Sequence, residues 1–143
     1  MSVTNQQMIT DAYLLIGVVA DGKQPTPVQS TVGIYVLNNN MLTQARDGWH
    51  LGWYPQGTAN LNTTAPVRDE DVNDVTMCLA AWLAGRYGIT IDPDPDPSNE
   101  ASLYNQMKAA FRRLSKRSLL YTECDLGELS RPQSGPWGGP NWL

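Results

Sequence analysis

The sequence is poor in the residues that build metal centres and nucleophilic sites. Its 143 residues include two cysteines and a single histidine, His50, and the cysteines form no CxxC pair. A zinc site needs three or four such ligands, so none is expected. No serine or cysteine lies in a nucleophile-elbow context, and Cys78 is expected to be a buried thiol within a helix. The sequence therefore predicts no metal, no cofactor and no enzymatic activity.

The chain also lacks an excess of basic charge and a long hydrophobic run. Its net charge is −4, which argues against a free-standing, strongly basic nucleic-acid binder. The apolar run at residues 13–20 is too short to cross a bilayer, and the polar start does not resemble a signal peptide. We expect a single domain-sized core, no membrane partner and a reducing cytoplasm at the site of synthesis.

Apolar residues at helical spacing predict four helices, over about residues 5–16, 27–46, 69–87 and 98–118. Capping-box patterns that begin at Thr4 and Thr26 support the first two, and acidic residues at 69–71 suit the N-terminus of the third. Because the second segment contains several β-branched residues, a strand is the competing interpretation there. The cap signals and the length of the segment favour the helix.

The segments between these helices have their own patterns. Large apolar residues alternate with other residues over positions 49–54, which is the period of a strand. A turn signal follows at 55–58, and residues 61–64 could form a second short strand. The pattern predicts a short β-hairpin or an extended loop. An isolated hairpin is marginal in water, so it would have to pack on the helices or on a neighbouring subunit. The alternating Asp and Pro of residues 92–97 predict a stiff, polyproline-like spacer without a calcium site.

The expected fold is therefore mainly α. A small four-helix core, residues 1–118, would carry the hairpin or extended loop between helices two and three, and residues 119–143 would form an extended C-terminal arm. From Ser130 the chain is rich in Gly and Pro, which disfavour helix and central strand. The arm is either a disordered tail or a docking segment, because Trp137, Trp142 and Leu143 would need an apolar surface.

Half of the basic residues lie in the last predicted helix. They are Lys108, Arg112, Arg113, Lys116 and Arg117, and they line two neighbouring edges of that helix. Such a basic stripe is either a solvated face with snorkelling side chains or a face that meets phosphates or a partner. A sequence-nonspecific DNA-binding module is therefore an alternative function. A cell-wall hydrolase that uses paired carboxylates is a weaker alternative, because any acidic chain offers such pairs.

The order of these patterns is shared with a known family. The segments that carry the likeness are the opening helix ending at Gly17, the 27–46 helix running into Gly48-Trp49, the extended Trp53-Tyr54, the third helix with residues 79–89, and the arm with Arg131-Pro132. Over nearly its whole length the chain resembles the head-completion proteins of short-tailed phages. These are also called tail accessory factors or packaged-DNA stabilisation proteins, the gene-product-four-like family.

The resemblance implies a non-enzymatic virion component that is made in the host cytoplasm. Copies would bind as a dodecameric ring on the portal protein after packaging, extend the DNA channel, retain the genome until ejection, and attach the next tail component, a nozzle or tail hub. The basic stripe would line the channel, in transient nonspecific contact with double-stranded DNA, or would meet a partner. The segment with Trp49, Trp53 and Tyr54 would contact the next component or a neighbouring copy. The arm residues that would bind the portal or a neighbour are Arg131, Pro132, Trp137, Trp142 and Leu143.

Overall fold

The computed structural model describes residues 2–134, with side chains described through Ser118. The helices are α1 (Asn5–Leu15), α2 (Pro27–Arg46), α3 (Asp69–Arg86) and α4 (Leu103–Ser134), with a 3-10 turn, η1, at Thr58–Asn60. Across residues 2–134 no β-strand forms, and the only bridge is an antiparallel pairing of Thr4 with Thr64. The mainly α fold with four helices is confirmed. The segment between α2 and α3 was expected to be a short β-hairpin or an extended loop, and the structure shows the loop.

Local signals set the starts of the first two helices. The Thr4 hydroxyl accepts a hydrogen bond from the Gln7 backbone at 3.2 Å, and the Gln7 side chain accepts one from the Thr4 backbone at 2.9 Å. Thr26 and Gln29 repeat this reciprocal arrangement at the start of α2. The predicted helix over the second segment is therefore confirmed against the strand. Gly17, with φ of 77°, follows α1 in the left-handed region that glycine tolerates best.

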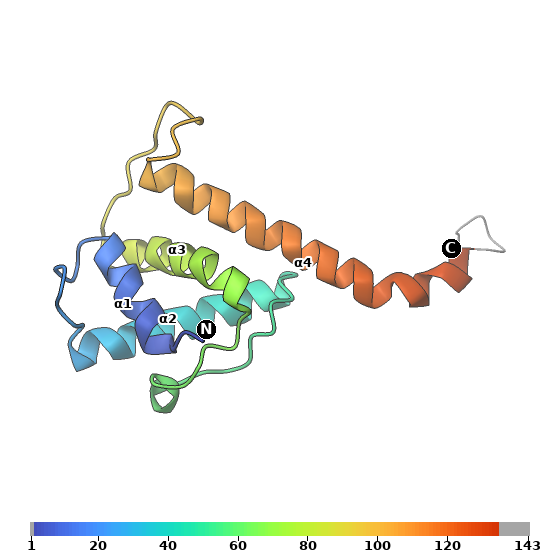
Figure 1. The fold of residues 1–143 in the computed structure, drawn as a ribbon, viewed down its shortest axis with the longest axis horizontal. Coiled ribbons are helices and arrows are strands. Elements are labelled where there is room, and N and C mark those ends of the chain that lie inside the picture. The colour runs from blue at the N-terminus through green and yellow to red at the C-terminus, as the bar shows by residue number, and fades with distance from the viewer. Residues whose placement is uncertain (1, 135–143) are drawn as a thin grey trace.

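Helix α3 is the central element of the core. It packs against α1 and α2 on one side and against α4 on the other (Figure 1). Ala80 and Ala84 are buried and permit this close approach. The Tyr13 hydroxyl of α1 donates to the Gln29 carbonyl at 2.7 Å and so satisfies the polar end of a fully buried ring. The large side chains that are almost completely buried include Met8, Ile9, Ile34, Leu37, Met41, Leu79, Leu83 and Leu114.

Gly33 allows α2 to approach α1 closely. A Cβ atom at this position would lie 2.4 Å from Cγ2 of the fully buried Ile9. We expect Gly33→Ala to lower the free energy of unfolding by about 1–3 kcal/mol, because this overpacking outweighs the better helix propensity of alanine. The matched control is Gly85→Ala in α3, where the added Cβ meets nothing within 4 Å. Thermal denaturation that found the two variants equally stable would contradict the close contact.

The loop between α2 and α3 packs on the helices, which is one of the two kinds of surface that the sequence predicts for it. The amide of the fully buried Asn5 donates to the Gln56 side chain at 2.9 Å and to the Asn60 carbonyl at 3.0 Å. From the other side, the Asn38 side chain of α2 accepts from the Gln56 backbone at 2.8 Å. These contacts fix the loop without a ladder of strand hydrogen bonds.

The segment before α4 contains local turns where a stiff, polyproline-like spacer was expected. The Asp94 carboxylate accepts from the Asp96 backbone at 2.8 Å, and the Asp96 carboxylate accepts from the Ser98 backbone at 3.0 Å. The Asp96 carboxylate also accepts from the Ser98 hydroxyl at 2.6 Å. These hydrogen bonds form tight local turns and hold the pKa values of both carboxyl groups below their usual range. Helix α4 consequently begins at Leu103 rather than near Ser98.

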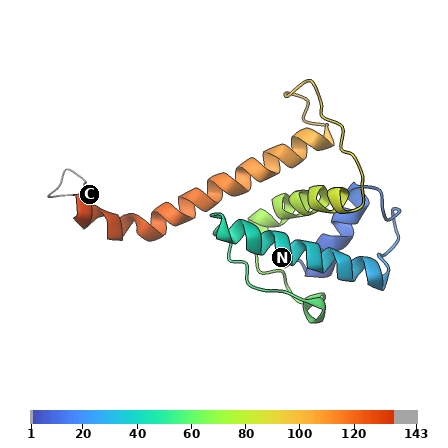
Figure 2. The same ribbon diagram turned by 180° about the vertical axis from the view of Figure 1, so that it is seen from behind.

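The predicted end of the last helix is also wrong. Helix α4 continues through Ser134, so the backbone of residues 119–134 is helical where an extended arm was expected, and Arg131 and Pro132 lie in its last turns. Pro132 removes a single backbone donor, two residues before the helix ends. Trp137, Trp142 and Leu143 lie outside the described residues. Figures 1 and 2 show α4 running past α3 and continuing away from α1 and α2.

Candidate functional site

The first half of α4 is attached to α3 by a cluster of ion pairs. The Arg113 guanidinium donates to the Asp74 carboxylate through Nε, 3.1 Å from both oxygens, and through Nη2, 2.7 Å from Oδ1. Asp74 is buried, whereas half of the Arg113 side chain is exposed. This two-pronged geometry is the strong form of an arginine–carboxylate contact, and it fixes the axial register of α4 on α3.

Arg117, one turn further along α4, bridges both acidic residues of α3. Its Nε lies 2.7 Å from Oδ1 of Asp71, and its Nη2 contacts Asp74. Asp71 is completely buried, and its contact with Arg117 is an ion pair without an aligned hydrogen bond. Burial raises the pKa of the Asp71 carboxyl above its usual value, and the Arg117 charge opposes that rise. Arg117 is therefore the charge in the cluster that favours the ionised form of Asp71 against the effect of burial.

The structure thus divides the predicted basic stripe into two groups. Arg113 and Arg117 face α3 and pair with its carboxylates, whereas Lys108, Arg112 and Lys116 are exposed. The Lys108 ammonium lies 5.2 Å from the centre of the Tyr104 ring, in a cation–π contact. Lys108, Arg112 and Lys116 are therefore better placed to meet a partner or a phosphate than the two arginines that already pair with carboxylates of α3. The sequence carried a signal for this division, since Asp71 and Asp74 are three apart and Arg113 and Arg117 are four apart, so each pair shares a helix face.

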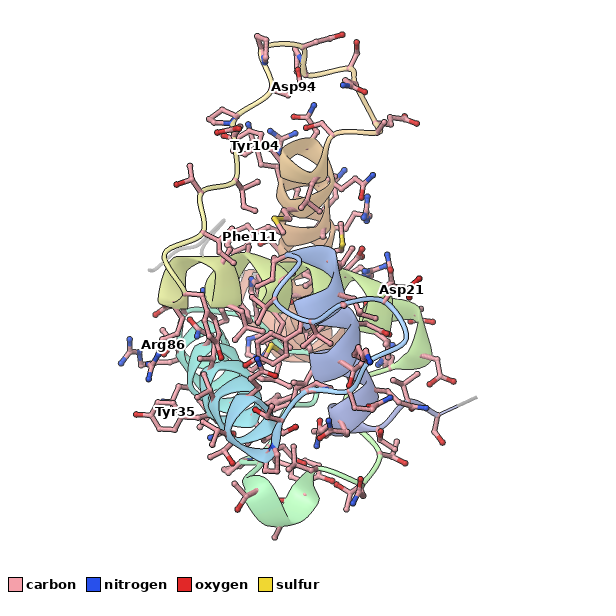
Figure 3. The ribbon with its side chains drawn as sticks, turned by 90° about the vertical axis from the view of Figure 1, so that its left-hand side faces the viewer. Asp21, Tyr35, Arg86, Asp94, Tyr104 and Phe111 are labelled. Atoms are coloured by element: carbon pink, nitrogen blue, oxygen red, sulfur yellow. The ribbon has the colours of Figure 1, made fainter. Side chains whose placement is uncertain are left out.

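A groove between α3 and α4 lies beside Lys108. Its volume is about 340 Å³. Cys78 is one of the lining residues, and its burial within α3 confirms the predicted buried thiol. Burial raises the pKa of this thiol to about 12. In Figure 3, Tyr104 and Phe111 lie on the side of α4 that faces the segment leading out of α3. Sequence reasoning missed this groove, because its walls come from two helices and a loop: Cys78, Ala81, Trp82, Ile91, Tyr104, Met107, Lys108 and Phe111. We call it the α3–α4 groove.

The aromatic residues of the predicted contact loop have different surroundings. Trp49 is 7% exposed, and its indole packs 6.4 Å from the Trp82 ring and 5.2 Å from the Phe111 ring, between centroids. Its Nε1 donates to the Ser115 hydroxyl at 3.2 Å. The Trp53 indole donates to Asn38 at 3.3 Å, and Tyr54 is 60% exposed. Trp49 and Trp53 therefore anchor the loop to the helices, and Tyr54 is the member of the three that solvent or a partner can reach.

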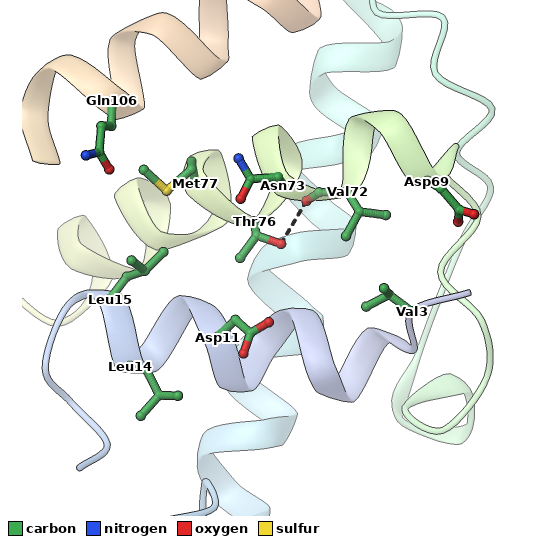
Figure 4. A pocket seen from close by; sticks show the side chains of 10 residues that line it. All are labelled: Val3, Asp11, Leu14, Leu15, Asp69, Val72, Asn73, Thr76, Met77 and Gln106. Atoms are coloured by element: carbon green, nitrogen blue, oxygen red, sulfur yellow. Dashed lines mark hydrogen bonds between the residues drawn. The ribbon is translucent and has the colours of Figure 1, made fainter. Parts of the chain in front are cut away.

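A second, larger groove lies between α1 and α3, with a volume of about 670 Å³ (Figure 4). It contains the carboxylates of Asp11 and Asp69, and burial raises the pKa of Asp11. The Thr76 hydroxyl donates to the Val72 carbonyl of its own helix at 2.8 Å, so it is not activated as a nucleophile. The ten lining residues include no histidine, lysine or cysteine that could serve as a base or a nucleophile.

Within the described part of the chain, no group of three His, Cys, Asp or Glu residues could hold a metal ion. None of the helices in that part is long and apolar enough to span a membrane. The residues that the structure brings together are thus the ion-pair cluster, the α3–α4 groove and the exposed basic residues of α4. Comparisons of the chain with protein-family models, with curated proteins and with solved structures find no match.

Proposed function

We propose that this protein is a non-enzymatic assembly subunit, the head-to-tail adaptor of a short-tailed phage. Copies dock on the portal protein as a ring after packaging, extend the DNA channel, help to retain the genome and present a platform for the next tail component. The observation that carries the proposal is the form of α4. Its first half is attached to the body by ion pairs with two buried carboxylates, and its second half continues beyond the body to Ser134.

A projecting helix of this kind favours a role in assembly. In proteins most of the stability of a helix comes from packing of one of its faces on another surface rather than from intrinsic propensity. The backbone of residues 119–134 lies away from α1, α2 and α3 in both views (Figures 1 and 2). A neighbouring protein that covers this segment would supply such packing. The pattern of helices, loop and arm that resembles the head-completion family points to the portal and to other copies of the chain as those neighbours.

The ion pairs also weigh against the DNA-binding alternative. A nonspecific DNA-binding face needs several cations that are free to contact phosphates. Arg113 and Arg117 are already paired with carboxylates of α3. The exposed Lys108, Arg112 and Lys116 remain, and three cations on one face suit the weak, sequence-blind contact that a DNA channel needs.

The direct test mixes the purified full chain with the portal protein encoded in the same genome. We expect the two to co-sediment as a complex whose mass shows one adaptor chain for each portal subunit, because a ring docked on a ring matches its symmetry. Capsid protein in place of portal is the control and should not co-sediment. A chain that stays in the low-mass fraction at all mixing ratios would contradict the proposal.

A further inference from the structure

The outer face of α2 carries a row of exposed apolar side chains. Val28, Tyr35 and Leu42 are 73%, 58% and 36% exposed. They follow one another at intervals of two helical turns, so they line a single face of the helix. In Figure 3 the Tyr35 side chain points outward from α2, away from α1. Single exposed apolar residues are common on protein surfaces, but a row of them on one helix favours an interaction surface.

This face also lacks charge. No residue from Pro27 to Ala45 is charged, although the solvent-facing side of a surface helix normally carries charged residues. Arg46 ends the helix, and its Nε lies 3.6 Å from the carboxylate of Asp47. A partner recognised by its own charges would find no opposite charge along this face. Two copies of the face, by contrast, would meet without electrostatic repulsion and without burying an unpaired charge.

The pattern of apolar and polar residues along the face is symmetric about Tyr35. Val28 and Leu42 lie at equal distances in the chain on either side of it, and so do Thr31 and Asn39. A twofold contact requires such self-complementarity, because a residue i that contacts j is matched by j contacting i. In an antiparallel pair of α2 helices centred on Tyr35, Val28 of each copy meets Leu42 of the other. Each positive helix N-terminus then lies beside a negative C-terminus, which is the favourable orientation.

The polar residues of the face suit the same contact. The Thr31 hydroxyl donates to the Pro27 carbonyl at 2.9 Å, so its hydrogen already has a partner and its oxygen can still accept. Asn39 is exposed in the single chain, and in the antiparallel pair its amide lies opposite Thr31 of the other copy, where it can donate to that oxygen. Covering these two side chains therefore leaves them with hydrogen-bond partners.

We propose that two copies of the free chain associate through the outer faces of their α2 helices, antiparallel and about a twofold axis at Tyr35. The two Tyr35 rings pack on each other at the axis, and Val28 packs on Leu42 at both ends. This pairing goes beyond the proposed function: neighbours in a ring are related head to tail, so the twofold contact belongs to the free chain. One helix face makes a small interface, and we expect a dissociation constant on the order of 10–100 µM.

The test is sedimentation equilibrium of the purified full chain without portal, at concentrations below and above that dissociation constant. We expect a mass that rises from one chain to two. Tyr35→Lys and Tyr35→Glu should each weaken association by about tenfold or more, because each variant places two like charges at the axis. An equimolar mixture of these two variants should associate again, since the introduced ammonium then faces the introduced carboxylate. Tyr54→Lys is the matched control, because Tyr54 is 60% exposed in the loop, and it should associate as the wild type does.

A second pair of variants tests the antiparallel orientation. Val28→Glu and Leu42→Lys should each weaken association, because each brings a charge against an apolar side chain. Their mixture should recover it, since one of the two symmetric contacts then joins opposite charges and the other is unchanged. In a parallel pair the two introduced charges would lie at opposite ends, and the mixture would not recover. All substituted positions are exposed, so circular dichroism should show unchanged helix content.

The outcomes are separable. A wild-type mass that stays at one chain or rises past two, a Tyr35 mixture that does not recover, or an equal effect of Tyr54→Lys would overturn the twofold pair. Recovery by the Tyr35 mixture without recovery by the mixture of Val28→Glu and Leu42→Lys would overturn the antiparallel orientation. Because no portal is present, each of these results is distinct from failure of portal binding.

Discussion

Arg117→Leu should lower the free energy of unfolding by about 3 kcal/mol at neutral pH, because removing one partner of a buried ion pair leaves an uncompensated charge. The charge left behind is Asp71, which is completely buried. Asp74 would keep its contact with Arg113. Chemical denaturation monitored by circular dichroism measures the change directly. Arg112→Leu, at an exposed position on the same helix, is the matched control and should stay within about 0.5 kcal/mol of the wild type.

The pH dependence of this loss identifies its cause. Burial already raises the pKa of Asp71 in the folded chain, and Arg117 opposes the rise, so the variant should have a still higher Asp71 pKa. The folded state then binds this proton more tightly than the unfolded state does, and ionised Asp71 costs stability only above that raised pKa. The loss should therefore be largest at neutral pH and shrink as the pH falls toward 4. Asp71→Asn in the Arg117→Leu background should recover part of the loss at pH 7. A loss that is the same at every pH would mean that Arg117 acts through packing alone.

Trp49→Ala should destabilise the protein by about 3–5 kcal/mol, in the range for truncating a large buried aromatic residue. Trp49 is 7% exposed and joins the loop to α3 and α4 through its contacts with Trp82 and Phe111. The truncation also leaves the Ser115 hydroxyl without the indole donor. The measurement is thermal unfolding, in which the midpoint should fall by roughly 6–20 °C for a chain of this size.

Tyr54→Ala is the matched control for this prediction. Tyr54 lies in the same loop but is 60% exposed, so its truncation should change the free energy of unfolding by no more than about 0.5 kcal/mol. If Trp49→Ala were equally mild, the buried position of Trp49 would be contradicted. The prediction that Trp49 belongs to a surface that contacts a partner would then regain support.

The elements that the sequence predicts well are those set by neighbouring residues. The reciprocal bonds of Thr4 with Gln7 and of Thr26 with Gln29 form as the capping-box pattern indicates, and α1 and α2 begin where those patterns place them. Helix α3 begins at the acidic Asp69 and ends just before Gly88, whose φ is 68°. Each of these signals acts within a few residues, so the helix boundaries that they set do not depend on the tertiary fold.

The features that could not be predicted from the sequence depend on side-chain hydrogen bonds that compete with helix formation, or on contacts between residues far apart in the chain. Asp94 and Asp96 bind backbone groups of the residues that follow them, and these local turns delay the start of α4. Asp74 and Arg113 are 39 residues apart in the chain, and only the register of α4 on α3 brings them together. The same register buries Trp49 against Phe111, which no alternation of apolar residues in the loop could reveal. The five basic residues of the predicted stripe all lie on α4, but two of them pair with carboxylates of α3 and the other three are exposed.

The central claim is that the end of α4 and the segment after it attach this protein to its assembly. Deleting residues 130–143 leaves all the helix-to-helix contacts of α1, α2 and α3 in place, so the far-ultraviolet circular dichroism should be almost unchanged. The measurement is co-sedimentation of this truncated chain with the portal protein, beside the full chain. We predict that the full chain binds and the truncated chain does not. Equal binding of the two chains would contradict the claim.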